Sequence, residues 1–248
     1  MKISINQMKA MKAAPNSAYD MIKPEFLFHS NKLEGSTFSE AELVRLVEEG
    51  LVEGSHDLDD VMETKNSLDV FDYTVDTLGQ PLSDELLWEM NRLLFRGTTE
   101  EANGFSGHYK RIPNRIRNSS VQVALPSDLP QAMPELFAQW DAASGFDDIA
   151  SFHARFEHVH PFQNGNGRIG RFLMMKQCIE NNVDLIVVDE ALERPYKSWL
   201  EVAQASGDER YLRETLAECQ QRFDAKMAER GVARLIPTEA EAAEAVGD

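Results

Sequence analysis

The stretch from His160 to Arg171, which reads HPFQNGNGRIGR, constrains this chain more than any other part of it. Its two Asn-Gly pairs predict a turn whose backbone can approach a ligand closely, because both residue types tolerate positive φ angles. The apolar spacing from Arg168 onward predicts that a helix begins there. A helix N-terminus offers free N–H groups and the positive end of the helix dipole, so the turn predicts an anion site.

Three charged or titratable side chains flank this turn. Arg168 and Arg171 are three residues apart, so they lie on adjacent parts of one helix face and can both contact phosphate oxygens. His160 precedes the turn, and an imidazole can accept a proton near neutral pH. A surface turn before a basic helix is the plainer explanation. The second Asn-Gly pair, the histidine and the two arginines together favour a phosphate site with a nearby base.

Composition indicates which kinds of partner and which cellular compartment to expect. The 248 residues are 42% hydrophobic, which supports one large domain or two small ones, and no apolar run is long enough for a membrane span. The formal charge of -17 argues against nucleic acid as a partner. Because the first residues lack a signal peptide's apolar stretch and the chain has only Cys178 and Cys219, we predict a cytoplasmic protein without membrane attachment.

Apolar periodicity predicts an all-α fold with one β-hairpin. Ile116 to Val123, with a turn at 118–120, is the best hairpin candidate, and Val183 to Val188 is interpreted as a buried connector. The first 13 residues carry no firm pattern, and the acidic, Ala-rich tail after Gly231 is predicted to fray or be disordered. Helices are predicted over about 17–34, 39–49, 57–78, 83–94, 131–143, 147–159, 168–182, 195–205 and 208–227.

Residues 160–171 resemble the signature of the Fic (filamentation induced by cAMP) family, which has a histidine, a phenylalanine, an acidic residue, Gly-Asn-Gly-Arg and a second arginine. The segments 107–113, 152–160 and 194–199 are similar to the flap region, to the helix before the motif and to part of the nucleotide pocket. The resemblance covers about residues 15–220 and implies a helical core with a β-hairpin flap. We predict an N-terminal segment at 1–55, a Fic core at 56–225 and a tail at 226–248.

The resemblance implies transfer of AMP from ATP to a Ser, Thr or Tyr hydroxyl of a target protein, with release of pyrophosphate. His160 would be the general base. The residues implied to bind nucleotide are Gly165, Asn166 and Gly167 at the α- and β-phosphates, with the Asn166 side chain as an added donor, Arg168 and Arg171 at the polyphosphate, and Tyr196 at the adenine, although helix packing explains Tyr196 nearly as well. The flap residues Ile116, Val121 and Val123 would pair with the target's backbone as an extra strand.

One position departs from the family pattern. Asn164 stands where the family has Asp or Glu holding Mg²⁺ against the phosphates. An amide oxygen is a neutral and weaker ligand for Mg²⁺ or Mn²⁺, so we expect weaker metal binding. The chain could transfer AMP slowly, use another donor or reaction, such as transfer of UMP, phosphocholine or phosphate, or only bind nucleotide as a regulatory protein.

A second motif concerns regulation. Ser30 to Gly35, which reads SNKLEG, resembles the family's inhibitory motif, here N-terminal to the core. By that resemblance Glu34 would pair with Arg171 and deny it to the γ-phosphate, because a bidentate carboxylate competes directly with phosphate for an arginine. In some relatives the same glutamate aligns a water that removes AMP, so the reverse reaction stays open. The plainer explanation is an exposed glutamate near a helix end.

A metal site is an alternative role for the histidines before the motif. His153, His158 and His160 could form one with Glu157, but their spacing fits no standard zinc signature and leaves the glycines and arginines unexplained. Lys110 belongs to a basic cluster with Arg111, Arg115 and Arg117, which is interpreted as a solvated edge or as a surface for target or nucleotide recognition. Self-modification and homo-oligomer formation stay open.

Overall fold

The computed structural model describes residues 1–116 and 119–247. The elements of this part are α1 (Ile5–Ala13), α2 (Tyr19–Lys32), α3 (Glu40–Glu49), α4 (Leu58–Asp76), α5 (Asp84–Leu94), α6 (Thr99–Ala102), η1 (Pro126–Asp128), α7 (Leu129–Ala142), α8 (Phe146–Val159), α9 (Asn166–Glu180), α10 (Glu193–Ser206), α11 (Arg210–Glu229), η2 (Val232–Leu235) and α12 (Glu239–Val246). The predicted all-α class is confirmed.

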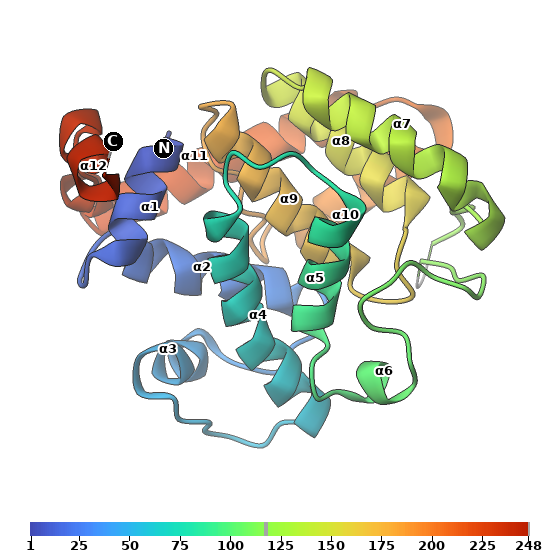
Figure 1. Cartoon of the computed structure of the whole chain (residues 1–248), viewed down its shortest axis with the longest axis horizontal. Coiled ribbons are helices and arrows are strands. Elements are labelled where there is room, and N and C mark those ends of the chain that lie inside the picture. The colour runs from blue at the N-terminus through green and yellow to red at the C-terminus, as the bar shows by residue number, and fades with distance from the viewer. Residues whose placement is uncertain (117–118, 248) are drawn as a thin grey trace.

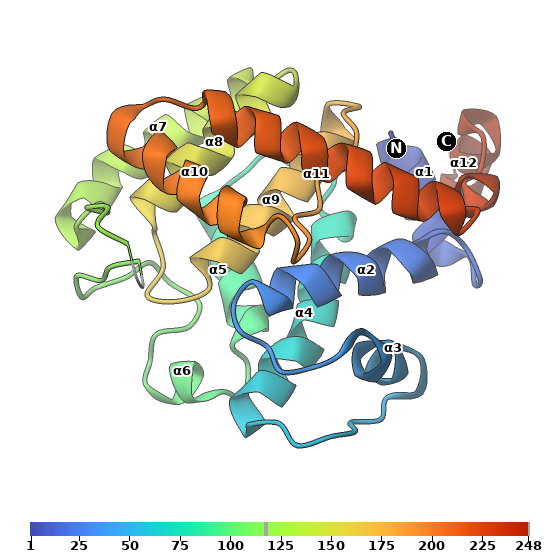
Figure 2. The ribbon, with the colours of Figure 1, turned by 180° about the vertical axis from the view of Figure 1, so that it is seen from behind.

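Helix α9 lies at the centre, and α1, α2, α4, α5 and α8 pack against it (Figure 1). Every residue of α9 is buried except Gly167 and Glu180. Seen from behind, α10 and α11 cover the opposite side (Figure 2). A helix that is buried on all sides and enclosed by neighbours is a rigid platform, and its N-terminus carries the motif that the sequence singles out.

Aromatic side chains join α9 to the helices before it. Phe172 of α9 lies 5.1 Å from Phe26 of α2 and 6.5 Å from Phe71 of α4, measured between ring centroids. All three rings are at most 2% exposed. Burying rings of this size stabilises the fold by about 2–3 kcal/mol each, so α2 is held firmly against the core.

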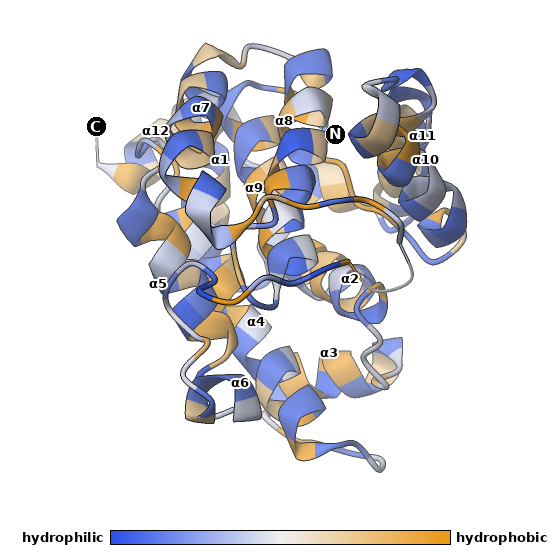
Figure 3. Cartoon of the chain, turned by 90° about the vertical axis from the view of Figure 1, so that its right-hand side faces the viewer, coloured by the Kyte–Doolittle hydropathy of each residue, from blue (hydrophilic) through white to orange (hydrophobic). Residues whose placement is uncertain are grey.

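Helix starts follow from local capping chemistry. Ser39 and Glu42 form the predicted capping box of α3, and the Ser83 hydroxyl accepts the N–H of Leu86 at the start of α5. Most outer helices carry apolar residues on one side and polar residues on the other (Figure 3). The predicted helices are all present, with ends that differ by a few residues.

Both chain ends differ from the prediction. The first residues form α1, and the acidic tail forms η2 and α12 rather than a frayed or disordered end. Helix α12 packs against α1, and Ala242 is fully buried. A capping box between Thr238 and Glu241 starts α12. Burial against a helix at the other end of the chain supplies the order that the local composition lacks.

The predicted hairpin does not occur in the part of the chain that the structure describes. Residues 116 and 119–123 contain no strand, and positions 117–118 of the predicted hairpin lie outside the described residues. Ser119 and Ser120 instead donate to the Glu201 carboxylate of α10. The connector at 183–188 is irregular and mostly buried, as predicted. In the described residues, no helix combines the length and apolar character that a membrane crossing requires.

Candidate active site

The motif forms a tight bend between two helices. His160 ends α8 in the left-handed conformation (φ 50°), and its N–H donates to Phe156. Gly165 precedes α9 with φ 83°, and a Cβ there would lie 2.7 Å from the Phe95 ring. Glycine is therefore required at 165, both for its conformation and for the close packing.

Asn166 fixes the bend from inside. Its side-chain oxygen accepts the Phe162 N–H at 2.8 Å, and its amide donates to the Phe162 carbonyl at 2.9 Å. Asn166 is 1% exposed. One donor of its amide is therefore used by the loop backbone, and the role of Asn166 as an added phosphate donor stays a prediction.

The segment before the predicted flap fixes the bend from outside. The Lys110 N–H donates to the Pro161 carbonyl, and the Lys110 ammonium donates to Asn114 and to the Val159 carbonyl. The Asn114 amide donates to Phe162. Lys110 is 3% exposed, so its interpretation as part of a solvated edge is wrong. Burial lowers the pKa of Lys110 to about 8.

His160 is neutral in this setting. Burial lowers its pKa to about 4, and the positive charge of Lys110 acts in the same direction, against the Glu157 carbonyl and Glu34. Its Nδ1 lies 3.3 Å from the Glu157 carbonyl oxygen. Because a carbonyl only accepts, Nδ1 carries the proton and Nε2 keeps its lone pair, which gives a base at neutral pH.

Buried titratable groups lie behind His160. The His153 Nε2 is 2.7 Å from the Tyr196 hydroxyl, and both side chains are at most 2% exposed. Burial, with the charge of Arg171, lowers the pKa of His153 to about 3. Burial raises the pKa of Glu157 to about 8. His153 is thus a structural residue, and Tyr196 contacts it from within the core. In the described chain, no three or more His, Cys, Asp or Glu side chains come together as a metal site.

Arg171 meets the predicted inhibitory motif. Its Nη2 donates to Glu34 at 2.7 Å and to the Ser30 carbonyl at 2.9 Å, and its Nε donates to the Ser30 hydroxyl at 3.0 Å. The predicted ion pair between Glu34 and Arg171 is therefore present. Burial acts to raise the pKa of Glu34, but Arg171 and Arg168 bring it below its ordinary value. A Cβ on Gly167 would lie 2.3 Å from the Glu34 carboxylate, which thus rests on the first turn of α9. Gly35 ends the motif with φ 94°.

Arg168 is paired as well. Its Nη1 lies 2.5 Å from a carboxylate oxygen of Glu63 on α4, and its guanidinium lies 5.4 Å from the centre of the Phe95 ring. Arg168 is 5% exposed. Glu63 belongs to no motif, so the sequence did not mark it. Both arginines, which lie in the first two turns of α9, therefore face a carboxylate from the N-terminal part of the chain.

Asn164 lies at the open edge of the bend. Its side-chain oxygen accepts the Gly165 N–H at 2.8 Å, and its carbonyl accepts from the Asn91 amide at 3.2 Å. Its amide nitrogen donates to Glu100 of α6 at 3.3 Å. Asn164 is exposed, whereas one Glu100 oxygen is buried and has no hydrogen-bond partner among the described residues. A carboxylate thus stands beside the position where the family signature has its acid.

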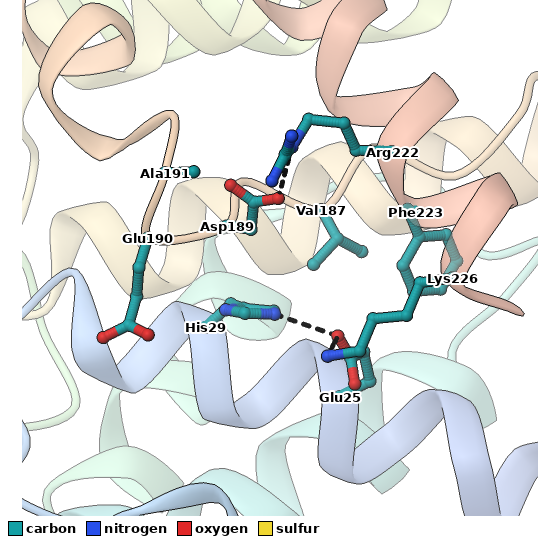
Figure 4. Close-up of a pocket in the computed structure, with 9 residues that line it drawn as sticks. All are labelled: Glu25, His29, Val187, Asp189, Glu190, Ala191, Arg222, Phe223 and Lys226. Carbon is teal, nitrogen blue, oxygen red and sulfur yellow. Dashed lines mark hydrogen bonds and ion pairs between the residues drawn. The ribbon is translucent and has the colours of Figure 1, made fainter.

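A separate cavity of about 380 Å³ lies on another side of α2 (Figure 4). Glu25 and His29 of α2 line it together with Lys226 of α11, and Glu25 pairs with both His29 and Lys226. At about 100° per residue, Glu25 lies about 140° around the helix from Ser30. This cavity therefore does not open onto the Arg171 site.

Comparison with known proteins agrees with this geometry. Residues 81–178, which include the whole motif, match the Fic/DOC family. The chain contains a Fic/DOC family domain. Solved structures share the fold: a Fic domain containing signaling protein from Bacteroides thetaiotaomicron VPI-5482 has a TM-score of 0.72 at 23% identity and covers 88% of this chain and 92% of its own. A Fic family protein from Desulfovibrio desulfuricans G20 has a TM-score of 0.68 at 17% identity, covering 95% and 77%.

Curated relatives extend the match beyond the Fic domain. The protein adenylyltransferase Fic of Aedes aegypti is 24% identical over 86% of this chain and 42% of its own length. The protein of the same name from Drosophila persimilis is 24% identical over 95% of this chain and 47% of its own. The chain spans less than half the length of these relatives. Glu34 lies outside the family match at 81–178.

The predicted flap residues are buried or half-buried side chains. Val121 is 8% exposed, and Ile116 and Val123 are half-buried. Ser119 and Ser120 hold the end of the segment to Glu201. Two side chains that the sequence did not mark, Asn91 and Asn114, bind backbone groups of the bend. The only signal in the sequence was that Asn114 directly follows residues 107–113, which resemble the family's flap region.

Proposed function

We propose that this chain transfers AMP from ATP to a hydroxyl group of a protein, with the chain itself as one acceptor. The observation that carries the proposal is a neutral His160 beside the buried N-terminus of α9, whose first two turns present Arg168 and Arg171. The Fic domain and the relatives named adenylyltransferase support it.

The chemical step follows from the tautomer of His160. Nε2 accepts the proton of the target hydroxyl as its oxygen attacks the α-phosphorus of ATP. The new bond joins that oxygen to the α-phosphorus, and the bond to the oxygen that bridges to the β-phosphorus breaks. Pyrophosphate leaves with the electron pair, and the target keeps AMP.

The first turn of α9 would bind the phosphates. The N–H groups of Asn166, Gly167 and Arg168 have no acceptor within the helix, as in any first turn, and they point toward the bend. Gly167 leaves room for an oxygen where the Glu34 carboxylate now rests. Arg168 and Arg171 would neutralise the polyphosphate charge. When bound, Mg²⁺ or Mn²⁺ would offset negative charge on the α- and β-phosphates.

We further propose that the chain is autoinhibited through Ser30, Glu34 and Gly35. Arg171 gives its Nη2 to Glu34 and its Nε to Ser30, so these donors are not free for a γ-phosphate in this arrangement. Glu34 is also the wrong charge for a position next to phosphate. ATP can bind productively only after this carboxylate leaves the first turn of α9.

A second candidate is a nucleotide-binding regulatory protein with little transfer. Asn164 favours it, because a neutral amide replaces the acid of the family signature and its oxygen is occupied by the Gly165 N–H. Transfer of UMP, phosphocholine or phosphate would use the same base and is distinguished by the donor alone.

Incubation of the protein with ATP labelled at the α-phosphate, with Mg²⁺ or Mn²⁺ present, tests these alternatives. We expect label on protein from the wild type, more from Glu34→Gly and none from His160→Ala. His158→Ala is the matched control, since this half-buried histidine lies outside the bend and should leave labelling unchanged. Nucleotide binding without label in any variant would favour the regulatory protein. Label from another nucleotide but not ATP would change the donor.

A further inference from the structure

Asn164, the position that departs from the family signature, contacts a carboxylate on another helix. Asn164 and Glu100 meet across 3.3 Å, from the amide nitrogen of the first to a carboxylate oxygen of the second. Helix α6, which carries Glu100, lies beside the bend in both ribbon views (Figures 1 and 2). The carboxylate thus stands one side chain away from the position of the family's acid.

The two residues are complementary in charge. An acid at 164 would place two carboxylates about 3 Å apart, and like charges at that distance disfavour each other strongly unless a proton or a cation lies between them. An asparagine removes the repulsion and donates a hydrogen bond to Glu100. The bend therefore keeps one negative charge, which has moved from position 164 to α6.

The second oxygen of Glu100 is left without a partner. It is buried and accepts no hydrogen bond from the described residues. An unsatisfied buried acceptor costs about 1–3 kcal/mol, and more when the group is charged, so this oxygen needs a donor or a cation as its partner. The neighbouring Glu101 differs, because its carboxylate accepts the Gly97 N–H at 2.8 Å.

We propose that Glu100 supplies the anionic oxygen for the divalent cation of the nucleotide complex, in place of the acid at position 164. This inference rests on the proposed function, because the phosphates of ATP would provide most of the remaining ligands. The donor set fits: Mg²⁺ and Mn²⁺ take carboxylate, amide and phosphate oxygens, and Mg²⁺ typically needs only one or two carboxylates from the protein. The Asn164 amide orients the Glu100 carboxylate.

Direct binding of Mn²⁺ tests the assignment. Titration of the full chain with α,β-methylene-ATP, which cannot be split between the α- and β-phosphates, is followed by calorimetry without metal. Mn²⁺ is then added, and the loss of the free-ion signal is measured by electron paramagnetic resonance. We expect Glu100→Gln to weaken Mn²⁺ binding to the nucleotide complex by at least about tenfold, and Glu101→Gln, which removes the same charge one residue away, to leave it unchanged.

A charge swap sharpens the test. Asn164→Asp in the Glu100→Gln background should restore Mn²⁺ binding, because it returns one carboxylate to the site. Wild-type Mn²⁺ affinity in Glu100→Gln, with nucleotide bound normally, would overturn this inference and leave the proposed function standing. Absence of nucleotide binding in every variant, also when Glu34→Gly is added to each, would overturn both. Equal weakening by Glu100→Gln and Glu101→Gln would reduce the effect to general electrostatics and also overturn the inference.

Discussion

Replacing Glu34 by glutamine tests whether its ion pair with Arg171 competes with nucleotide binding or only stabilises the fold. The change keeps the size of the side chain and removes its charge, so Arg171, which is 3% exposed, loses an anionic partner at 2.7 Å while both contacts to Ser30 remain. A hydrogen bond to a charged group contributes about 1.5–3 kcal/mol. Because the Glu34 side chain is 33% exposed, solvent screening favours the lower half of that range, about 1.5–2 kcal/mol.

Loss of this free energy should lower the stability of the nucleotide-free protein and raise its affinity for nucleotide. The nucleotide-free protein should lose about 3–8 °C in Tm, at about 2–4 °C for each kcal/mol in a chain of this size. Nucleotide affinity should rise by about 10- to 30-fold, because binding no longer has to break the pair. Circular dichroism measures the first effect, and calorimetric titration with α,β-methylene-ATP measures the second.

The control for this prediction is Glu49→Gln. Glu49 pairs with Arg45 on α3, and both side chains are more than 40% exposed, so the change should alter Tm and affinity little. A lower Tm in Glu34→Gln together with wild-type nucleotide affinity would refute the reasoning, because it would show that the pair stabilises the fold without competing with phosphate.

Three further variants test the supporting structure. Phe172→Ala should cost about 3–5 kcal/mol in urea unfolding, because it empties the contact between α9, α2 and α4; a cost below about 1 kcal/mol would contradict that packing. Asn166→Ala should lower both stability and AMP transfer, since it leaves the Phe162 N–H buried without an acceptor, and unchanged transfer would show that the bend holds by itself. The pKa of Glu157 is raised from 4.5 to about 8, so the folded state retains a proton that the unfolded state has lost, and stability should fall between about pH 4.5 and 8. Glu157→Gln should flatten this fall in pH-dependent unfolding curves, and an identical fall in both proteins would rule out Glu157 as its source.

Local signals made the helices predictable. The capping box at Ser39 and the hydroxyl cap at Ser83 depend on residues three apart, which a sequence displays directly. Thr238 and Glu241 have the same spacing, but the prediction of a frayed or disordered tail rested on its acidic and Ala-rich composition. The order of α12 comes from burial against α1, and sequence spacing carries no record of such a distant contact.

The site residues also fall into two groups: those that a short motif marks and those that only the fold brings to the bend. Glu34 and Arg171 were predicted because a short motif marks each of them, although 137 residues separate the two. Lys110 and Asn114 were not, because they act on backbone carbonyls of the bend, and a carbonyl has no identity in the sequence. The hairpin prediction used the right residue types, but no strand forms in the described part of 116–123, and Ser119 and Ser120 of the predicted turn bind Glu201 of α10.

The burial of Arg168 and Arg171 gives a physical reason for the proposed autoinhibition. Both guanidinium groups lie at the positive end of α9 and are at most 5% exposed, so without an anion each would be a buried charge without a partner, which is strongly destabilising. Glu63 and Glu34 remove that cost in the nucleotide-free protein, and their side chains are 20% and 33% exposed. Any carboxylate that stabilises the empty site must occupy the positions that phosphates need. The more deeply such a chain buries its phosphate-binding arginines, the more its empty form depends on an internal competitor, and autoinhibition then follows from the requirement for a stable fold.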